Sequence, residues 1–285
     1  MNSSVMKFDG MIREKVNIAV QKIKRDVEEG PTDILKWFTF MATDIIGVLS
    51  FGRSFNALET EKVIIDELLA KNSANDRQKT QYIKDLDVVI MISGLKTELE
   101  PLFSLLSILP LPPPLGREAP KIHNRFCQYG LTAIKGYTKQ IQDNNDTGSN
   151  CLFSKVIRND DMSEELMAVE AGNFIVAGTE TTSNTLTYLI YTLLLPQNEN
   201  IKEKLMKEIA DVPTDAESQQ LLSLAYLKGA IMETLRIYGG APGSLPRICP
   251  SGMNLSSYYI PAGTTISTQF YSLHYDPSVF PEPEK

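Results

Sequence analysis

The chain has 285 residues, of which 42% are hydrophobic and 22% are charged, so it has enough apolar material for one large or two small globular domains. Its net charge of −7 and the lack of a basic face argue against a nucleic-acid-binding protein. The three cysteines, Cys127, Cys151 and Cys249, form no C-x-x-C pair. We therefore expect neither a zinc motif nor a disulfide framework.

The sequence predicts no signal peptide, because no apolar core follows the basic residues near the start. It also contains no uninterrupted apolar run of roughly 18 residues, so no membrane span is predicted. The segment Pro101 to Gly116, PLFSLLSILPLPPPLG, is the one candidate for peripheral contact with a membrane. A buried helix end followed by a proline-rich loop is the favoured explanation of this segment.

The first part of the chain has helical periodicity. Apolar residues recur every three or four positions from Val5 to Val27, and Gly30-Pro31 ends this helix. Thr32 can cap the next helix, ILKWFTFMATDIIGVL, which is apolar on most sides and is expected to be central. The turn FGRSF at residues 51–55 breaks it. Further helices are predicted over 59–70, 78–99 and 122–137, with a polar loop at 143–150.

A long helix is predicted after these elements. Ser163 is its expected N-cap, and no proline follows until Pro196, which gives about 33 residues and a length of roughly 50 Å. Shorter helices are predicted over Asn200–Ala210 and Leu224–Tyr238.

From Gly239 onward, turn residues alternate with short β-branched runs. Leu245–Cys249 and Thr264–Phe270 are predicted as strands joined through the turn Pro261-Ala262-Gly263. The chain is therefore expected to be mainly α, with a small β element near its C-terminal end. We find no repeat and no linker, so we expect a single domain over residues 1–285.

The stretch AGTETTSNTL, from Ala177 to Leu186, interrupts the apolar pattern of the long helix. A glycine and several threonines lower helix propensity by up to about 1 kcal/mol each. The Thr181 hydroxyl can reach the Ala177 carbonyl one turn back, which bends helices and admits water. Gly178 would let a flat group lie on the backbone, and Glu180 with Thr181 could relay protons beside it.

A helix crossing explains the same residues, because small side chains allow close packing and Glu180 would then need only an internal partner. A second signal is the pair Glu233 and Arg236 in IMETLRIY, three residues apart and surrounded by apolar side chains. We expect this ion pair to be buried or half-buried. Pairs at this spacing are also common on helix surfaces.

These motifs, in this order, resemble the cytochrome P-450 family of haem-thiolate monooxygenases. AGTETT at 177–182 resembles the oxygen-activating motif of that family, and ETLR at 233–236 resembles its E-x-x-R motif. The segments APGSLPRICP, IPAGTTISTQFYSLH and DPSVFPEPEK resemble the strands and loop that follow in microsomal and fungal members. FGRSF resembles an earlier turn of the family. The resemblance implies a P-450-like helical fold, truncated at both ends.

The resemblance also implies a cofactor and roles for individual residues. A haem would lie against Ala177 and Gly178, and Glu180 with Thr181 would be the catalytic pair that delivers protons to bound dioxygen. Arg247 would pair with a haem propionate. The substrate pocket would be lined by Phe174, Ala177, Ser244 and Leu245. Arg247 is otherwise explained as a surface arginine at a strand end.

The remaining implications concern stability, partners and location. Glu233 and Arg236 would be a structural ion pair beneath the haem rather than catalytic residues. The enzyme would hydroxylate a small organic substrate with electrons from an NADPH-dependent reductase. The segment Pro101–Gly116 resembles the region that touches the membrane in anchored relatives. Such relatives often lie on the endoplasmic reticulum, whereas no anchor is recognised in this sequence.

One expected feature of the family is not found. The axial cysteine, which favours O–O cleavage by donating electron density, lies in the family in an F-x-x-G-x-R-x-C loop. That loop is expected beyond Lys285, and none of Cys127, Cys151 and Cys249 has this context. No metal ligand is therefore assigned. Two readings follow: a monooxygenase described by an incomplete chain, or a catalytically incompetent helical fragment or pseudoenzyme without the ligand loop.

Overall fold

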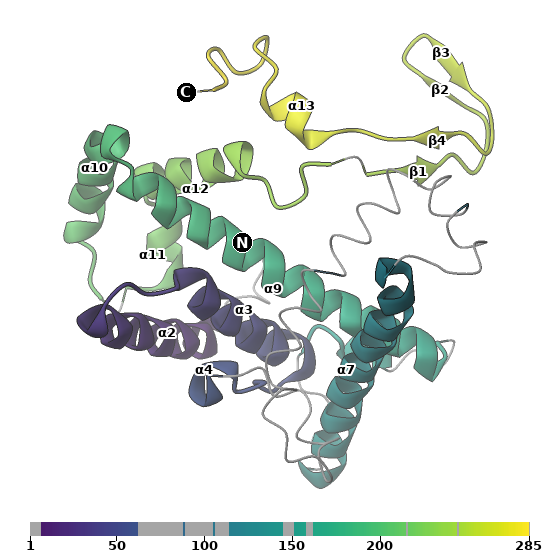
Figure 1. Ribbon diagram of the computed structural model, residues 1–285, viewed down its shortest axis with the longest axis horizontal. Coiled ribbons are helices and arrows are strands. Elements are labelled where there is room, and N and C mark those ends of the chain that lie inside the picture. Colours follow the sequence, from purple (N-terminus) through teal and green to yellow (C-terminus); the bar gives the residue numbers. More distant parts are fainter. Residues whose placement is uncertain are drawn as a thin grey trace.

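The computed structural model describes residues 7–61, 114–144, 151–157, 162–214, 216–243 and 245–284, together with residues 88 and 105 (Figure 1). Its elements in chain order are α2 (Asp9–Glu29), α3 (Ile34–Phe51), α4 (Ala57–Thr60), α7 (Pro114–Asn144), α8 (Ser154–Ile157), α9 (Glu164–Leu194), the 3-10 turn η2 (Pro196–Asn198), α10 (Glu199–Ala210), α11 (Ser218–Leu222), α12 (Ala225–Ile237), β1 (Arg247–Ile248), β2 (Met253–Leu255), β3 (Tyr258–Ile260), β4 (Thr265–Ile266) and α13 (Phe270–His274). The mainly α fold with a small β element agrees with the prediction.

Helix α3 is the centre of the packing, as its apolar composition predicts. It contacts α2, α7 and α9, and Trp37 and Phe51 on it are fully buried. By length and composition alone this helix could cross a membrane, but 61% of its apolar window is buried against other helices. That burial is typical of the core helix of a folded domain. The same core includes Tyr137 of α7, Phe153 before α8 and Ile175 of α9.

The N-terminus of α3 is capped differently from the prediction. The side chain of Asp33 accepts a hydrogen bond from the Lys36 amide at 3.1 Å, so Asp33 and not Thr32 is the N-cap. The Thr32 hydroxyl instead donates to Asp26 Oδ2 at 3.4 Å. An aspartate is the stronger choice here, because its carboxylate also complements the positive end of the helix dipole.

A buried carboxylate holds the turn after α3. Asp44 is fully buried, and its two carboxylate oxygens accept from the amides of Ala57 at 2.9 Å and Leu58 at 3.0 Å, at the N-terminus of α4. Burial raises the pKa of this carboxyl, while the two amide donors act in the opposite direction. Gly52 ends α3 with a positive φ of 69°, as expected for the FGRSF turn. The predicted helices at 59–70 and 78–99 and the loop at 143–150 lie largely outside the described residues.

Helix α9 crosses α7 at close range because both helices have a glycine at the crossing. A Cβ on Gly130 of α7 would lie 2.1 Å from the Ala168 carbonyl oxygen of α9. A Cβ on Gly172 of α9 would lie 3.1 Å from the Phe126 carbonyl oxygen of α7. Ser163 caps α9 as predicted, accepting from the Leu166 amide at 3.3 Å, and the helix runs without interruption to Leu194.

The β element follows α12 and consists of two small antiparallel pairs. β1 pairs with β4 in the register Arg247 to Ile266, so the two predicted strands do pair. Their connection was predicted incompletely, because it contains the hairpin β2–β3 before the Pro261 turn. Gly263 has a φ of 81° and its amide donates to the Cys249 carbonyl at 2.8 Å, which closes the turn.

The cap formed by Asp44 is expected to be sensitive to the loss of one oxygen. Asp44→Asn leaves a single acceptor for two buried amides and should reduce the free energy of unfolding by about 1–3 kcal/mol. Asp211→Asn, on an exposed residue at the end of α10, should change it by less than about 0.5 kcal/mol. Urea unfolding followed by circular dichroism measures both. Equal effects of the two substitutions would contradict the capping role.

Candidate functional site

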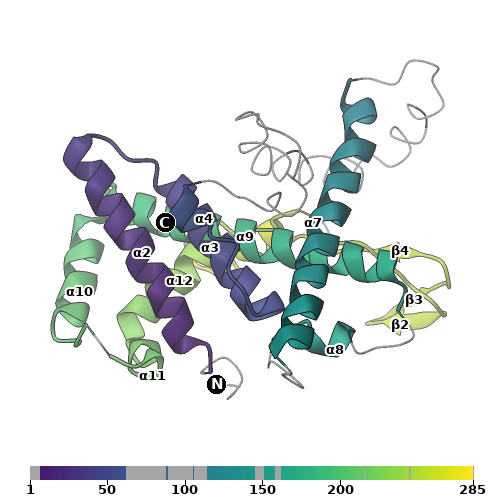
Figure 2. The same cartoon turned by 90° about the horizontal axis from the view of Figure 1, so that it is seen from below.

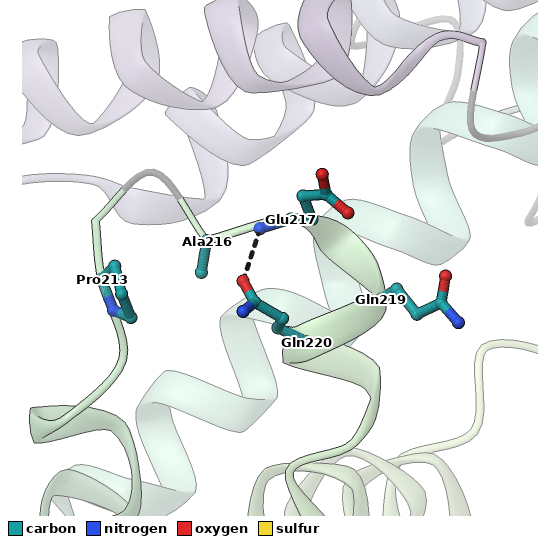
Figure 3. A pocket seen from close by; sticks show the side chains of 5 residues that line it. All are labelled: Pro213, Ala216, Glu217, Gln219 and Gln220. Atoms are coloured by element: carbon teal, nitrogen blue, oxygen red, sulfur yellow. Dashed lines mark hydrogen bonds between the residues drawn. The ribbon is translucent and has the colours of Figure 1, made fainter.

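A hollow beside α11 is not the site of the predicted chemistry. It measures about 640 Å³ and is lined by Pro213, Ala216, Glu217, Gln219 and Gln220 (Figure 3). The Glu217 amide donates to Gln220 Oε1 at 3.0 Å, and the two side chains form the capping box of α11. Its polar groups cap a helix and bring together one carboxylate and no base, so the motif on α9 is the better candidate for the site.

One face of the α9 motif is closed by α3. Thr43 and Thr179 are fully buried, and their Oγ1 atoms lie 3.3 Å apart. Thr43 donates to the Thr39 carbonyl at 2.8 Å, so Thr179 is the donor between the two hydroxyls. A Cβ on Gly178 would lie 2.5 Å from Cγ1 and 3.0 Å from Cβ of Ile46. Gly178 therefore permits the close packing of two helices, as the helix-crossing interpretation predicts.

The other face of the motif is open. Ala177 and Thr181 are exposed on α9, and the Thr181 hydroxyl donates to the Ala177 carbonyl at 2.8 Å, as predicted. Thr185 repeats this bond one turn later, donating to the Thr181 carbonyl at 2.8 Å. Gly240 lies against this face, since a Cβ there would be 3.4 Å from Thr181 Cβ. In Figure 1, the chain from α12 to β1 passes on the side of α9 away from α3.

Glu180 lies between the two faces and is half-buried. The Asn184 side chain, one turn along α9, donates from Nδ2 to Glu180 Oε1 at 2.7 Å. Ser183 donates to the Glu180 carbonyl at 3.2 Å. Glu180 and Thr181 are consecutive on α9, so their side chains point about 100° apart, and the predicted acid and hydroxyl lie on adjoining faces of the helix. Asn184 is a contact of the site that the sequence motif alone did not identify.

The other predicted cofactor and pocket residues lie in different surroundings. Arg247 is exposed on β1, its Nη1 donates to the Pro246 carbonyl at 2.9 Å, and it makes no ion pair within the described residues. Leu245 is also exposed. Phe174 packs edge-on against Phe153 at a centroid distance of 5.5 Å, on the core side of α9. Ser244 lies outside the described residues. The assignment of Phe174, Ala177, Ser244 and Leu245 to the substrate pocket stays a prediction.

The predicted ion pair is present on α12. Arg236 is paired through two hydrogen bonds with Glu233, at 2.9 Å from Nε and 2.7 Å from Nη2. The Arg236 side chain is only 7% exposed, whereas that of Glu233 is 51% exposed, so the expectation of burial holds for the arginine. The hydrogen bond from Arg236 lowers the pKa of the Glu233 carboxyl.

Arg236 also holds the C-terminal segment. Its Nη1 donates to the carbonyls of His274 at 2.9 Å and Pro283 at 2.8 Å. Its guanidinium lies 5.6 Å from the ring centre of Tyr275 and 5.2 Å from that of Phe280. His274 Nδ1 donates in return to the Arg236 carbonyl at 3.0 Å. One side chain therefore ties α12 to residues 274–283, a role that the E-x-x-R spacing does not reveal.

The cysteines have no metal-binding arrangement in the part of the chain that the structure describes. Cys249 is buried and its Sγ donates to the Ser251 carbonyl at 2.8 Å, and Cys151 is buried in the core. Cys127 is half-buried on α7. No cluster of three or more His, Cys, Asp or Glu side chains occurs among the described residues.

A long central helix with one open face, the clamped E-x-x-R pair and the small sheet after it together define a mainly α architecture. Residues 1–285 match the family described as Cytochrome P450, and the chain belongs to that family. Haem is the cofactor that the family implies.

Curated relatives agree with this assignment. The chain is 32% identical to the cytochrome P450 monooxygenase tazI of Aspergillus terreus, over 99% of this chain and 55% of that protein. It is also 32% identical to the cytochrome P450 monooxygenase azaI of Aspergillus niger, over 100% of this chain and 57% of that protein. An averantin hydroxylase of Dothistroma septosporum is 27% identical over 92% of this chain and 46% of that protein. The chain spans about half the length of these relatives, which are fungal enzymes of the kind found in secondary metabolism.

The packing at Gly178 generates a stability prediction. Gly178→Ala places a methyl group against Ile46 and should lower the free energy of unfolding by about 1–3 kcal/mol despite a better helix propensity. Gly229→Ala on α12, where no atom lies within 4 Å of the new methyl, should instead be stabilising by up to about 1 kcal/mol. Combining Gly178→Ala with Ile46→Val should restore part of the loss. A stabilising Gly178→Ala would contradict the close contact.

The clamp at Arg236 is expected to order residues 274–283. Arg236→Lys removes the paired hydrogen bonds and should cost about 1–3 kcal/mol, with faster hydrogen exchange at the amides of Tyr275 and Phe280. Lys202→Gln breaks an exposed pair with Glu199 at the same spacing and should cost less than about 0.5 kcal/mol.

The clamp should also depend on pH. Because the pKa of Glu233 is lowered in the folded chain, the contribution of its ion pair to the free energy of unfolding is complete above the unfolded pKa of 4.5. This contribution is lost as the pH falls through the lower pKa of the folded chain. Unchanged exchange rates in the Arg236 variant would contradict the clamp.

Proposed function

We propose that this chain forms the oxygen-side half of a haem-dependent monooxygenase that hydroxylates a small organic substrate. The observation that supports the proposal most directly is the division of α9 into two faces. Gly178 and Thr179 are used in packing against α3, while Ala177 and Thr181 remain exposed beside Gly240. An open face with a hydroxyl and an adjacent carboxylate is suited to proton delivery into a pocket.

The residues on this side fit a flat, dianionic macrocycle. Ala177 offers a small side chain on the open face, and the exposed guanidinium of Arg247 is available within the described residues for a propionate. When bound, the haem supplies the activation of dioxygen, with an axial thiolate as the ligand of the family. Leu245 and Phe174 are proposed, with Ser244, to line the substrate pocket.

The proposed role of Thr181 and Glu180 is to hold and move protons. The Thr181 hydroxyl has one hydrogen, which it donates to the Ala177 carbonyl at 2.8 Å. Rotation about χ1 would break this bond and present the hydroxyl to the open face. Glu180 would take a proton from solvent and pass it on toward Thr181, because it is half-buried between the packed and the open face and its Oε1 is held by Asn184. Asn184 would thereby keep the carboxylate in one orientation.

The partners and the location follow the same proposal. Two electrons for each turnover would come from an NADPH-dependent reductase. One relative is named for hydroxylating averantin, and a comparable small organic substrate is proposed here. Association with the endoplasmic reticulum is proposed as in anchored members of the family. The segment Pro101–Gly116, predicted to touch the membrane, lies largely outside the described residues, and its last three residues begin α7.

The proton role is tested in the monooxygenase that contains this chain together with the haem-ligand loop. Thr181→Ala removes the hydroxyl and should reduce product formed per NADPH consumed by about tenfold, while NADPH consumption continues and peroxide accumulates. Thr181→Ser keeps the hydroxyl and should retain most of the coupling. Thr187→Ala is a matched control, since Thr187 also bonds back along α9, to the Ser183 carbonyl at 2.8 Å. Unchanged coupling in Thr181→Ala would refute the role.

A further inference from the structure

One threonine of the α9 motif differs from its neighbours in where its hydroxyl bonds. The hydroxyls of Thr181, Thr185 and Thr187 all donate to the carbonyl four residues back on α9. Thr179 is fully buried, and the bond that the structure gives its hydroxyl joins its Oγ1 to Oγ1 of Thr43 on α3, at 3.3 Å. Thr179 therefore bonds across a helix interface, where the other three bond along their own helix.

Thr43 can only accept from α9, because its own hydrogen is already used. Its hydroxyl donates to the Thr39 carbonyl at 2.8 Å, which leaves its lone pairs for Thr179. Helix α3 lies against α9 in both views (Figures 1 and 2). It is anchored in the core by the fully buried side chains of Trp37 and Phe51. The acceptor for Thr179 is thus presented by a rigid element that approaches the motif from the side away from its open face.

The loss of this acceptor would redirect the Thr179 hydroxyl. A buried donor without a partner is costly, so the hydroxyl would turn to another acceptor. The Ile175 carbonyl, four residues back on α9, can be reached by rotation about χ1, because threonine in a helix has a rotamer that makes this bond. A hydroxyl that bonds back in this way weakens the backbone ladder and bends the helix.

Such a bend would fall next to the predicted proton-delivering residue. Thr181 is two residues beyond Thr179, and a Cβ on Gly240 would lie 3.4 Å from its Cβ. The preceding part of α9 is held against α7 at Gly172. A bend between residues 175 and 179 would therefore change the direction of the Thr181 hydroxyl relative to both contacts. Misplacement of a reacting group by about 1 Å can reduce a rate by about a hundredfold.

We propose that Thr43 is a positioning residue for proton delivery at Thr181. It accepts the hydrogen of Thr179 and thereby prevents a second back-bond in the α9 motif. Thr43 itself lies in the packed interface and acts only through Thr179. This role rests on the proposed function, because it requires Thr181 to deliver protons.

The first test removes the acceptor in the monooxygenase that contains this chain together with the haem-ligand loop. Thr43→Val keeps the shape of the side chain and should reduce product formed per NADPH consumed by about threefold at equal haem content. Thr43→Ser restores the acceptor and should restore the coupling. Thr39→Val is the matched control, since Thr39 is a buried threonine one turn earlier on α3 whose hydroxyl makes no bond to α9 in the described part of the chain.

The second test removes the donor as well. In Thr43→Val combined with Thr179→Val, no hydroxyl remains to bond back, so coupling should return to within about 1.5-fold of the native value. Thr179→Val alone should also be close to native, because Thr43 keeps its bond to the Thr39 carbonyl. If these residues served packing alone, the effects of the two substitutions on coupling would add rather than cancel.

Hydrogen exchange on the same proteins provides a readout that does not depend on turnover. In α9 the Thr179 amide donates to the Ile175 carbonyl, which a back-bonded hydroxyl would share. The Thr179 amide should therefore exchange about threefold faster in Thr43→Val and at the native rate in the double variant.

The outcomes separate this role from the proposed function. If Thr181→Ala reduces coupling but Thr43→Val does not, the positioning role of Thr43 is wrong and the proton role of Thr181 stands. If Thr181→Ala leaves coupling unchanged, both roles are wrong. A double variant less coupled than Thr43→Val would also overturn the positioning role. Should Thr43→Val not take up haem, the double variant decides, because it must then take up haem and couple normally.

Discussion

The contact between α3 and α9 is the constraint on which the rest of the arrangement depends. Two neighbouring positions of α9, Gly178 and Thr179, are committed to it, one by steric fit against Ile46 and one by a buried hydrogen bond to Thr43. Because successive residues of an α-helix are about 100° apart, this pair fixes the rotation of α9 about its axis. Ala177 and Thr181, about 40° apart from each other, are then directed well away from α3. A sliding or rotated α9 would leave a buried hydroxyl unpaired, which costs about 1–3 kcal/mol.

The same arrangement explains how a central helix accepts so many polar residues. The hydroxyls of Thr181, Thr185 and Thr187 each donate to the carbonyl four residues back, at 2.8 Å. Each hydroxyl is therefore satisfied by its own helix and needs no partner from another element. The helix continues unbroken through the motif, so the low helix propensity of these residues is offset by packing along its length. Polar groups can then be placed on the open face without weakening the closed one.

The sequence predicted the features that follow from periodicity or spacing within one helix. It missed the features that depend on contacts between elements distant in the sequence. Helices α3 and α9, the bond from Thr181 to the Ala177 carbonyl and the pairing of Glu233 with Arg236 follow from spacing within one element. The orientation of Gly178 does not, because a glycine in a helix is equally consistent with a flat ligand and with a neighbouring helix. The hairpin β2–β3 was missed because alternation of apolar residues is weak over strands of three residues. The clamp on residues 274–283 was missed because its acceptors are backbone carbonyls, which leave no mark in a side-chain pattern.

The residues used in packing and the residues proposed for chemistry lie on different faces of the same helix, α9. On α9 they alternate within six residues, so a motif that looks like one functional unit is two sets of residues with different partners. On α12, the two members of the ion pair differ in exposure. Arg236 is buried and donates to backbone and carboxylate acceptors, while about half of the Glu233 side chain is exposed. A carboxylate in that position can accept a further cation without disturbing the clamp, because its arginine is held independently by two carbonyls. Glu233 thus keeps an exposed carboxylate on α12, while Arg236 stays buried with acceptors of its own.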